Sequence, residues 1–427
     1  MRLLGSRFLT AVLLINVCLY SLCFMAQVPM MPYLTKALGA DTIEYGKLQT
    51  VFSALQCLGG LLAGPLLDRY GGKAMLVVSF LSSIACYSLT ATATTLTGLY
   101  ASRLPSVLQH AVLAARTIVT DSSSDEDRAT VLGYVGMAMS VGFAVGPALG
   151  GLLQTPQATA WFGAGVSVFS VLSIVIFLPA LHKATKPVAG ATGKAAANSD
   201  AMDNVFLRFW KVVSLPSIRP LLVAKVFTGL AQAIFQVMFT LTLQQQYKLD
   251  SKINGFVLSY LGVIIGLVQA FLVRIVVKMN GEGRSAYLSL WAMMAGFLGL
   301  AMSESIGQLC FMLLPLTAGS LIFSTVNTSQ LTKAVTPSQT GTVLAIDMSL
   351  FSGVRMLAPS VGAALLTRFG PNSIPLACMF LLILLVTVSK VGLLKFDDWD
   401  SKSASFQKQV AEMEAEEAAL ELQKKDT

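Results

Sequence analysis

The amino-acid sequence predicts an all-α membrane protein in which twelve transmembrane helices form two parallel six-helix repeats. Three observations predict this fold class. The 427-residue chain is 55% hydrophobic and only 12% charged, whereas soluble domains carry about 25% charged residues. Its apolar segments fall into two groups of six, and each segment approaches the length of about 20 residues that a spanning helix needs. An internal repeat relates the two groups. A soluble enzyme is therefore excluded.

The first group of apolar segments lies near residues 8–29, 45–67, 74–95, 98–119, 130–153 and 159–180. The second group lies near residues 220–243, 254–277, 286–303, 307–330, 342–366 and 373–394. Arg2 and Arg7 precede the first segment as they would in a signal peptide, but the segment lacks a small-x-small cleavage site. We interpret it as a retained first helix.

These groups divide the chain into four parts: an N-terminal half (1–180), a connector (181–218), a C-terminal half (219–395) and a polar tail (396–427). The connector is basic with an Ala/Gly/Thr-rich middle, which is typical of a flexible cytosolic linker. The tail contains the acidic stretch VAEMEAEEAALEL, which favours a solvated helix. We expect such a helix to offer a surface for a cytosolic protein partner.

The positions of the basic residues predict that both termini are cytosolic. With that topology, the inner segments hold 21 of the 30 Lys and Arg residues, the spans hold 4 and the outer loops hold 5. The five outer residues are Lys36, Lys47, Lys248, Lys252 and Arg368. This asymmetry follows the positive-inside rule, although most of it lies in the connector and termini. The net charge of +8 therefore indicates a membrane surface and no nucleic-acid partner.

A shift of 212 residues aligns the fifth span with the eleventh. It places Thr130-Val131-Leu132-Gly133 on Thr342-Val343-Leu344-Ala345, and Gly146-Pro147-Ala148-Leu149-Gly150 on Ala358-Pro359-Ser360-Val361-Gly362. An offset of six helices preserves the direction of each helix through the membrane. The halves are therefore parallel repeats about an axis along the membrane normal, and we expect a binding site between them at mid-depth.

Two motifs are more specific signals than the repeat. The first, Gly64-Pro65-Leu66-Leu67-Asp68-Arg69-Tyr70-Gly71-Gly72-Lys73, joins the second and third spans through an acid, a base and a glycine turn. The second is a set of small residues and one proline on the fifth span, namely Gly142, Gly146, Pro147, Gly150 and Gly151. Glycines at i, i+4 and i+8 form a groove for a neighbouring helix. The alternatives are a plain hydrophilic turn and generic glycine packing.

Together these motifs resemble the major facilitator superfamily, and the second resembles the pattern of its twelve-helix drug/proton antiporters. Arg103 resembles the arginine of the antiporter motif in the fourth helix, although Val107 occupies the usual glycine position. Val28-Pro29-x-x-Pro32 and Ser102-Arg103-Leu104-Pro105 are similar to an organic cation transporter-like branch of solute carrier family 22. The resemblance implies a cytosolic gate formed by Asp68, Arg69, Lys73 and Asp121. The corresponding turn of the second half, Lys278-Met279-Asn280-Gly281, lacks the acid, so a second gate is expected to be degraded.

Few charged groups lie inside the spans, because each costs about 2.5 to 3.5 kcal/mol at the bilayer centre. The candidates for a substrate or proton site are Arg103, His110, Lys225, Gln232, Gln236, Asp347 and Arg355. Arg103 and His110 are seven residues apart, which places them on one face of a continuous helix. Asp347 and Arg355 are about 80° apart around their helix and are not an obvious pair. We expect these charged groups to face a wet cavity or each other.

The sequence predicts a secondary transporter that works by alternating access, with proton-coupled antiport of organic cations or amphiphilic drugs as the leading hypothesis. Two alternatives stay open. A facilitative or symport carrier of an organic anion or metabolite is favoured by the excess of cationic residues in the spans. A scaffold that transports little would use the tail for partner binding.

No Walker lysine loop, G-x-S-x-G sequence or metal-ligand constellation occurs in the sequence, so neither an enzyme nor a cofactor is expected. The six cysteines lie in apolar stretches and are interpreted as packing residues. The sequon Asn327-Thr328-Ser329 lies at an inner helix end, where it stays unmodified. We expect a plasma-membrane location, apical membranes included, with an intracellular membrane as the alternative.

Overall fold

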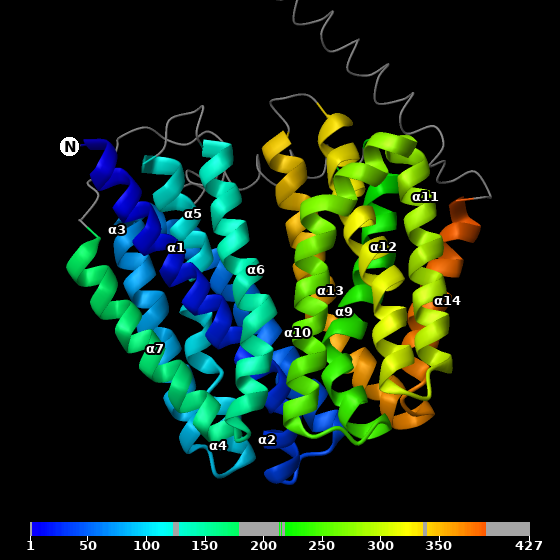
Figure 1. Ribbon diagram of the computed structural model, residues 1–427, viewed down its shortest axis with the longest axis horizontal. Helices are drawn as coiled ribbons and strands as arrows, with labels where there is room; N and C mark the ends of the chain where they lie inside the picture. Colours follow the sequence, from blue (N-terminus) through cyan, green and yellow to red (C-terminus); the bar gives the residue numbers. More distant parts are fainter. Residues whose placement is uncertain are drawn as a thin grey trace, which may run out of the picture.

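The computed structural model describes residues 2–122, 128–178, 213, 215, 218–335 and 340–389, and the elements within these ranges are all helices. The N-terminal half consists of α1 (Arg2–Gln27), η1 (Val28–Met30), α2 (Met31–Ala37), α3 (Thr42–Thr92), α4 (Leu96–Ala101), η2 (Leu104–Leu108), α5 (Ala111–Ser122), α6 (Arg128–Leu153) and α7 (Pro156–Phe177). The C-terminal half consists of α9 (Arg219–Gln246), α10 (Ser251–Leu267), η3 (Val268–Leu272), α11 (Val273–Met302), α12 (Ile306–Lys333), α13 (Thr340–Phe369) and α14 (Ser373–Val388). Figure 1 shows the two halves side by side.

The all-α membrane fold with twelve spans is confirmed. Nine described helical stretches are long and apolar enough to cross a membrane, and one of them, Ser251–Met302, contains two successive spans. The fourth span is broken into α4, η2 and α5, and the twelfth is the shorter apolar helix Ser373–Val388.

Glycine turns join the second span to the third and the eighth to the ninth at equivalent places. Gly71 has φ 81° and ψ 165°, and Gly281 has φ 75° and ψ 170°. Positive φ at these values strains any residue with a Cβ atom, so glycine is required at both turns. The two halves therefore repeat the same local geometry, even where their sequences differ.

The fourth span is not the continuous helix that the hydropathy of residues 98–119 predicts. Pro105 lies in the interruption, where it lacks an N–H donor and crowds the preceding turn. Neighbouring side chains satisfy the backbone groups that the break releases. Gln56 Nε2 donates to the Ser106 carbonyl at 2.8 Å, and the Tyr20 hydroxyl donates to the Gln109 carbonyl at 2.8 Å. Such breaks are tolerated in a membrane only where protein or water supplies these partners.

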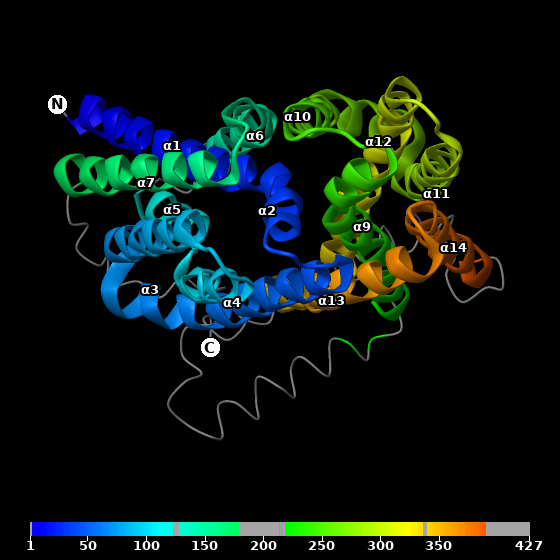
Figure 2. The same ribbon diagram turned by 90° about the horizontal axis from the view of Figure 1, so that it is seen from below.

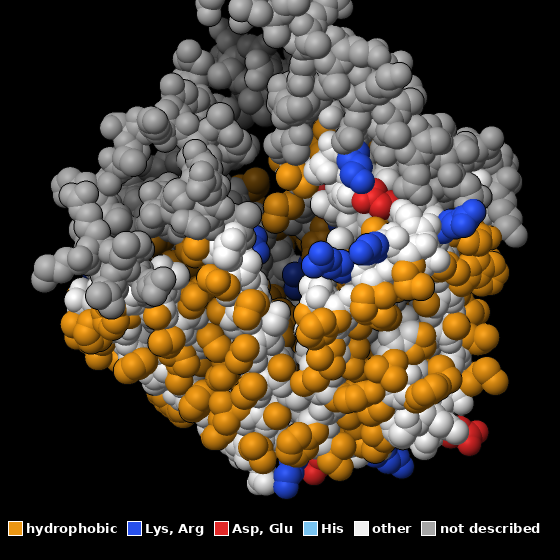
Figure 3. Space-filling model, turned by 45° about the horizontal axis from the view of Figure 1, so that its top comes forward, with side chains coloured by type: hydrophobic (Ala, Val, Ile, Leu, Met, Phe, Trp, Pro, Cys, Tyr) orange, Lys and Arg blue, Asp and Glu red, His pale blue; other side chains and the backbone are white. Residues whose placement is uncertain are grey.

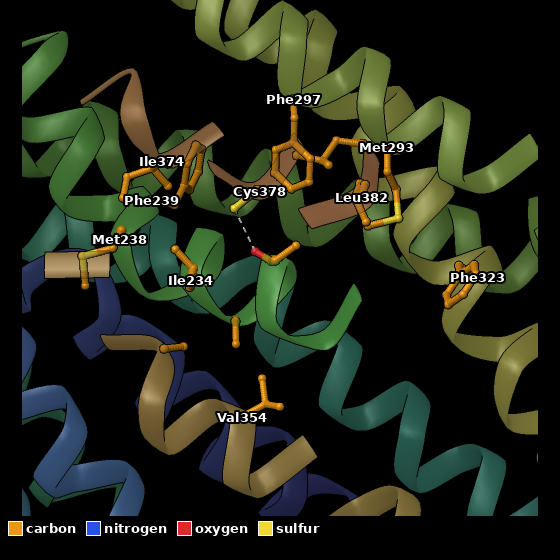
Figure 4. Close-up of a cluster of buried hydrophobic side chains, with 14 of the residues drawn as sticks. Ile234, Met238, Phe239, Met293, Phe297, Phe323, Val354, Ile374, Cys378 and Leu382 are labelled. Carbon is orange, nitrogen blue, oxygen red and sulfur yellow. Dashed lines mark hydrogen bonds between the residues drawn. The ribbon is translucent and has the colours of Figure 1, made fainter. Parts of the chain in front are cut away.

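The C-terminal half has a continuous hydrophobic core between α9, α11, α12, α13 and α14 (Figure 4). Phe297 lies at its centre, fully buried, and meets the edge of the Phe235 ring at a centroid distance of 5.6 Å. The Cys378 thiol is also fully buried and donates to the Ala231 carbonyl at 3.2 Å. This cysteine packs as the small core residue that the sequence suggests.

The halves meet along two pairs of helices that the internal repeat relates: α6 with α10, and α3 with α13 (Figure 2). The Pro147 carbonyl on α6 faces Gly255 of α10, and the Pro359 carbonyl on α13 faces Gly46 of α3. Pro147 and Pro359 are equivalent in the 212-residue repeat. Close approach of backbone to glycine therefore occurs at both interfaces, as expected of small-residue packing in membranes.

Hydrogen bonds between the halves gather at the end of the molecule opposite the N-terminus. The Tyr33 hydroxyl donates to the Leu249 carbonyl at 2.7 Å, Gln245 Nε2 donates to Thr42 Oγ1 at 3.0 Å, and others in the described chain join Thr50 to Ser360, Ser251 to Gln154, and Asn254 to Tyr33. We call this end the closed end. On the opposite face, Figure 3 shows a hollow between the halves with Lys and Arg side chains around and inside it.

The glycine groove of α6 packs against α1. A Cβ atom on Gly146 would lie 2.6 Å from the Leu22 carbonyl oxygen and 2.8 Å from Met25 Cβ, whereas a Cβ on Gly133 of the same helix meets nothing within 4 Å. Gly142 and Gly150 contact α1 one turn to either side of this point. The groove therefore packs within the N-terminal half, while Gly151 faces Lys252 of the other half.

We expect Gly146→Leu to destabilise the protein by about 1 to 3 kcal/mol or more through overpacking, and Gly133→Leu to leave stability unchanged. Thermal unfolding of the two purified variants beside the wild type measures the difference. Equal melting temperatures for both variants would contradict the close α1–α6 contact.

Candidate functional site

A cavity lies between the halves and encloses about 1450 Å³, its open side included. Helices α1, α3 and α6 and the broken fourth span line it from the N-terminal half, and α9, α10 and α13 line it from the C-terminal half. Its walls are mostly apolar and aromatic, with Phe24, Phe52, Phe143, Phe235 and Phe239 among them. Four amide side chains also line it: Gln27, Gln49, Gln109 and Gln236. The cavity lies between the halves, where the repeat predicts a binding site, and it has the apolar character of a small-molecule pocket.

Two arginines, Arg103 and Arg355, line the cavity, and the described residues of its lining include no Asp or Glu. Arg103 follows α4 at the break in the fourth span and donates from one terminal nitrogen to Thr90 Oγ1 at 2.8 Å. Its Nε atom is buried without a hydrogen-bond partner among the described residues. Its guanidinium therefore keeps donors for a ligand.

Arg355 lies on α13 in the opposite half, with its guanidinium 5.8 Å from the centroid of the Phe351 ring. The ammonium of Lys225 lies 5.9 Å from the same ring. An aromatic face stabilises a nearby cation without neutralising it. Arg355 lines the cavity and forms no ion pair with the described residues. Its positive charge is therefore available to a ligand.

Lys225 of α9 and Asp347 of α13 form an ion pair beside the cavity instead of within its lining. Lys225 Nζ lies 3.0 Å from Asp347 Oδ1 and 3.1 Å from Oδ2, and both side chains are about one-tenth exposed. The Thr328 hydroxyl of α12 reaches the same carboxylate at 3.5 Å. Asp347 does not pair with Arg355, as the sequence predicts. Its pairing with Lys225 was not predicted, because Lys225 and Asp347 lie 122 residues apart in the sequence.

Two further expected site residues, His110 and Gln232, also lie outside the cavity lining. His110 does not share a helix face with Arg103, because the fourth span is interrupted between them; its side chain packs against Gly59 of α3. Gln232 donates to the Ser320 carbonyl at 3.4 Å and joins α9 to α12. Gln236, one turn further on, does line the cavity.

The expected cytosolic gate is described only for its two basic members, since the side chains of Asp68 and Asp121 lie outside the described residues. Arg69 lies 5.4 Å from the centroid of the Tyr70 ring. Lys73 donates to the Val175 carbonyl at 3.3 Å and to the Leu178 carbonyl. Lys73 therefore places its charge at the C-terminal end of α7, where the helix dipole favours a cation.

The second half has an acidic group that the motif comparison missed. Glu282 directly follows the turn at Gly281 and binds the end of α12: it accepts from Ser329 Oγ at 2.7 Å and pairs with Lys333 Nζ at 2.9 Å. Glu282 follows its turn glycine, whereas Asp68 precedes Gly71. Comparison of equivalent positions in the two motifs therefore did not reveal Glu282. This cluster joins α11 to α12 within one half.

Gln27 is a further residue that sequence reasoning missed. It ends α1, lines the cavity and is 7% exposed, and neither its Oε1 nor its Nε2 has a hydrogen-bond partner in the described chain. The only sequence signal was its place as a polar residue between an apolar helix and Val28-Pro29.

With this geometry established, comparison with known proteins identifies the family. The profile of the Major Facilitator Superfamily matches residues 13–359. The chain belongs to the Major Facilitator Superfamily. It is 30% identical to solute carrier family 22 member 18 of Mus musculus, over 82% of this chain and 87% of that protein. It is 27% identical to the class G tetracycline resistance protein of Vibrio anguillarum, over 69% of this chain and 74% of that protein.

Solved structures of the same fold also match. A mutant of the nucleoside transporter NupG superposes with a TM-score of 0.74 at 14% identity, covering 90% of this chain and 99% of NupG. The chain is therefore a multi-pass membrane transporter of this superfamily and not an enzyme. The resemblance that the motifs predicted is confirmed.

We expect Asp347→Asn, which leaves the Lys225 charge buried and unpaired, to destabilise the protein by about 3 to 5 kcal/mol. The double variant Lys225→Met/Asp347→Leu removes both charges and should regain most of this loss. Unfolding of the wild type, Asp347→Asn, the double variant and its two single variants, Lys225→Met and Asp347→Leu, in the same detergent tests the pairing. A double variant whose destabilisation equals the sum of its single variants would show that the two groups do not interact.

Proposed function

We propose that this transporter carries amphiphilic organic anions by alternating access, with the two arginines of the cavity holding the negative charge of the substrate. The observation that carries the proposal is the charge of the site: two guanidinium groups face an apolar cavity whose described lining contains no carboxylate. An arginine forms bidentate hydrogen bonds to carboxylate, sulfonate or phosphate groups, and the apolar surroundings strengthen them.

The aromatic walls support an amphiphilic substrate. Phe24 and Phe52 stack at a centroid distance of 6.1 Å, and Phe235 and Phe239 lie 4.9 Å apart on the other side. Such surfaces bury the apolar body of a ligand, and burial contributes about 25 cal/mol for each Å² removed from water. A small inorganic anion would leave these walls without a partner.

Alternating access is supported by the arrangement of the halves. Their mutual hydrogen bonds lie toward one end, whereas the hollow opens on the opposite face, on the side where α1 begins. Placing the connector and both termini in the cytosol, as the basic residues favour, makes this conformation open to the cytosol. A plasma-membrane location stays our expectation, and so does a cytosolic partner for the tail, which lies outside the described residues.

A second candidate is proton-coupled antiport of organic cations or amphiphilic drugs. It is favoured by the glycine-proline groove of α6 that the antiporter-like motif forms, and by the similarity to tetracycline resistance proteins. Aromatic walls also suit a cation. In this case a proton has to be carried by a group such as Asp347 or His110, because the lining itself offers no acid in the described chain.

We expect proteoliposomes containing the wild type to take up an aromatic carboxylate faster than an amine of the same size. Arg355→Gln should reduce this uptake by about tenfold or more, since a hydrogen bond to a charged group contributes about 1.5 to 3 kcal/mol. Arg368→Gln, which removes an equal charge at an exposed position of α13 outside the cavity lining, is the matched control. Faster uptake of the amine, unaffected by Arg355→Gln, would reject the anion proposal.

If the second candidate is correct, uptake of an organic cation will drive protons across the membrane in the opposite direction. Asp347→Asn and His110→Gln would then be compared for substrate-driven proton flux, measured with a pH-sensitive dye inside the vesicles. Loss of coupling with retained substrate movement would identify the proton carrier. Anion transport without any proton flux would leave only the first candidate.

A further inference from the structure

The cavity contains buried polar atoms that none of the described residues satisfies, and they indicate where a ligand is held. Both amide atoms of Gln27 and the Nε atom of Arg103 are in this position. A buried donor or acceptor without a partner carries a free-energy cost, and a ligand that supplies the partner removes it. Gln27 and Arg103 both belong to the N-terminal half, so this half offers a polar anchor of its own.

The second cationic group, Arg355, belongs to the other half and lies at a different depth. Arg103 follows Leu96, the first residue of α4, by seven residues, and Arg355 precedes Phe369, the last residue of α13, by fourteen. α4 begins and α13 ends toward the closed end (Figure 1). Because Arg355 is separated from the end of its helix by twice as many residues as Arg103 is from the start of α4, Arg355 lies farther than Arg103 from the closed end.

We infer that the cavity takes an elongated organic dianion, which binds one acidic group at Arg103 beside Gln27 and the other at Arg355. This inference rests on the proposed anion transport and specifies its substrate class. The apolar middle of such a molecule lies against the aromatic walls between the two charged ends. Linear and aromatic dicarboxylates have this chemistry.

The charge balance favours a dianion over a monoanion. One carboxylate neutralises one guanidinium and leaves the other without a counter-charge in a partly dehydrated cavity, which is unfavourable. A dianion neutralises both, and it also connects the two halves through groups that move relative to each other. A ligand shifts a conformational equilibrium only by its differential affinity for the two states, and contacts to both halves provide such a difference.

The test compares ligands that differ in one acidic group. The full-length protein in lipid nanodiscs is titrated with decanedioate, decanoate and decyltrimethylammonium, and binding is followed by thermal stabilisation. We expect decanedioate to bind at least about tenfold more tightly than decanoate, because it gains a second charge-assisted contact. Adipate and dodecanedioate then measure the spacing of the two sites.

Variants assign the two ends. Arg103→Gln and Arg355→Gln should each lower the affinity for decanedioate to that for decanoate, and Gln27→Leu should lower it less. Arg103→Lys keeps the charge without the bidentate geometry and should retain part of the affinity. Arg368→Gln, at an exposed position outside the cavity lining, should leave the affinity unchanged.

Equal affinity for decanedioate and decanoate would overturn the dianion inference while leaving anion transport intact. Binding of decyltrimethylammonium alone would overturn both. Because the comparison of ligands on the wild type already decides between these outcomes, a variant that fails to fold does not remove the test.

Discussion

The cost of a charge inside the bilayer is the constraint on which this structure depends. A cationic group in a spanning segment has to be paired or has to face water. Lys225 follows the first course through its ion pair with Asp347, and Arg103 and Arg355 follow the second by lining the cavity. The pair binds α9 to α13 within one half, whereas the arginines stand on opposite halves. In the function that we propose, the ion pair therefore stabilises the structure and the two arginines bind the ligand.

Backbone packing sets where the halves can approach each other. At the interfaces of α6 with α10 and of α3 with α13, a proline carbonyl of one half meets a glycine of the other half. These contacts and the hydrogen bonds of the closed end hold one side of the cavity shut. Because related interfaces occur at α6 with α10 and at α3 with α13, we propose that the halves move as two bodies about the region between them.

The sequence predicted the fold well because hydropathy, the repeat and the glycine turns are local signals. The prediction was wrong at the fourth span, because hydropathy does not register that Pro105 lacks the N–H group that a regular helix needs. The helix is interrupted there, so Arg103 and His110 do not share a helix face as predicted. The prediction also missed Gln27 and the contacts of Glu282, and it left Lys225 and Asp347 unpaired. Such pairs depend on long-range packing, which no spacing along one helix reveals. Arg103, Gln236 and Arg355 were predicted as site residues and do line the cavity.

We propose that the two arginines of the cavity, and not the Lys225–Asp347 pair, hold the substrate. The most direct measurement is a cryo-electron microscopy structure in lipid nanodiscs saturated with decanedioate. Our account predicts ligand density that contacts the guanidinium groups of both Arg103 and Arg355, with the ion pair intact. Density beside Asp347, or a cavity without ligand at a concentration that stabilises the protein, would contradict it.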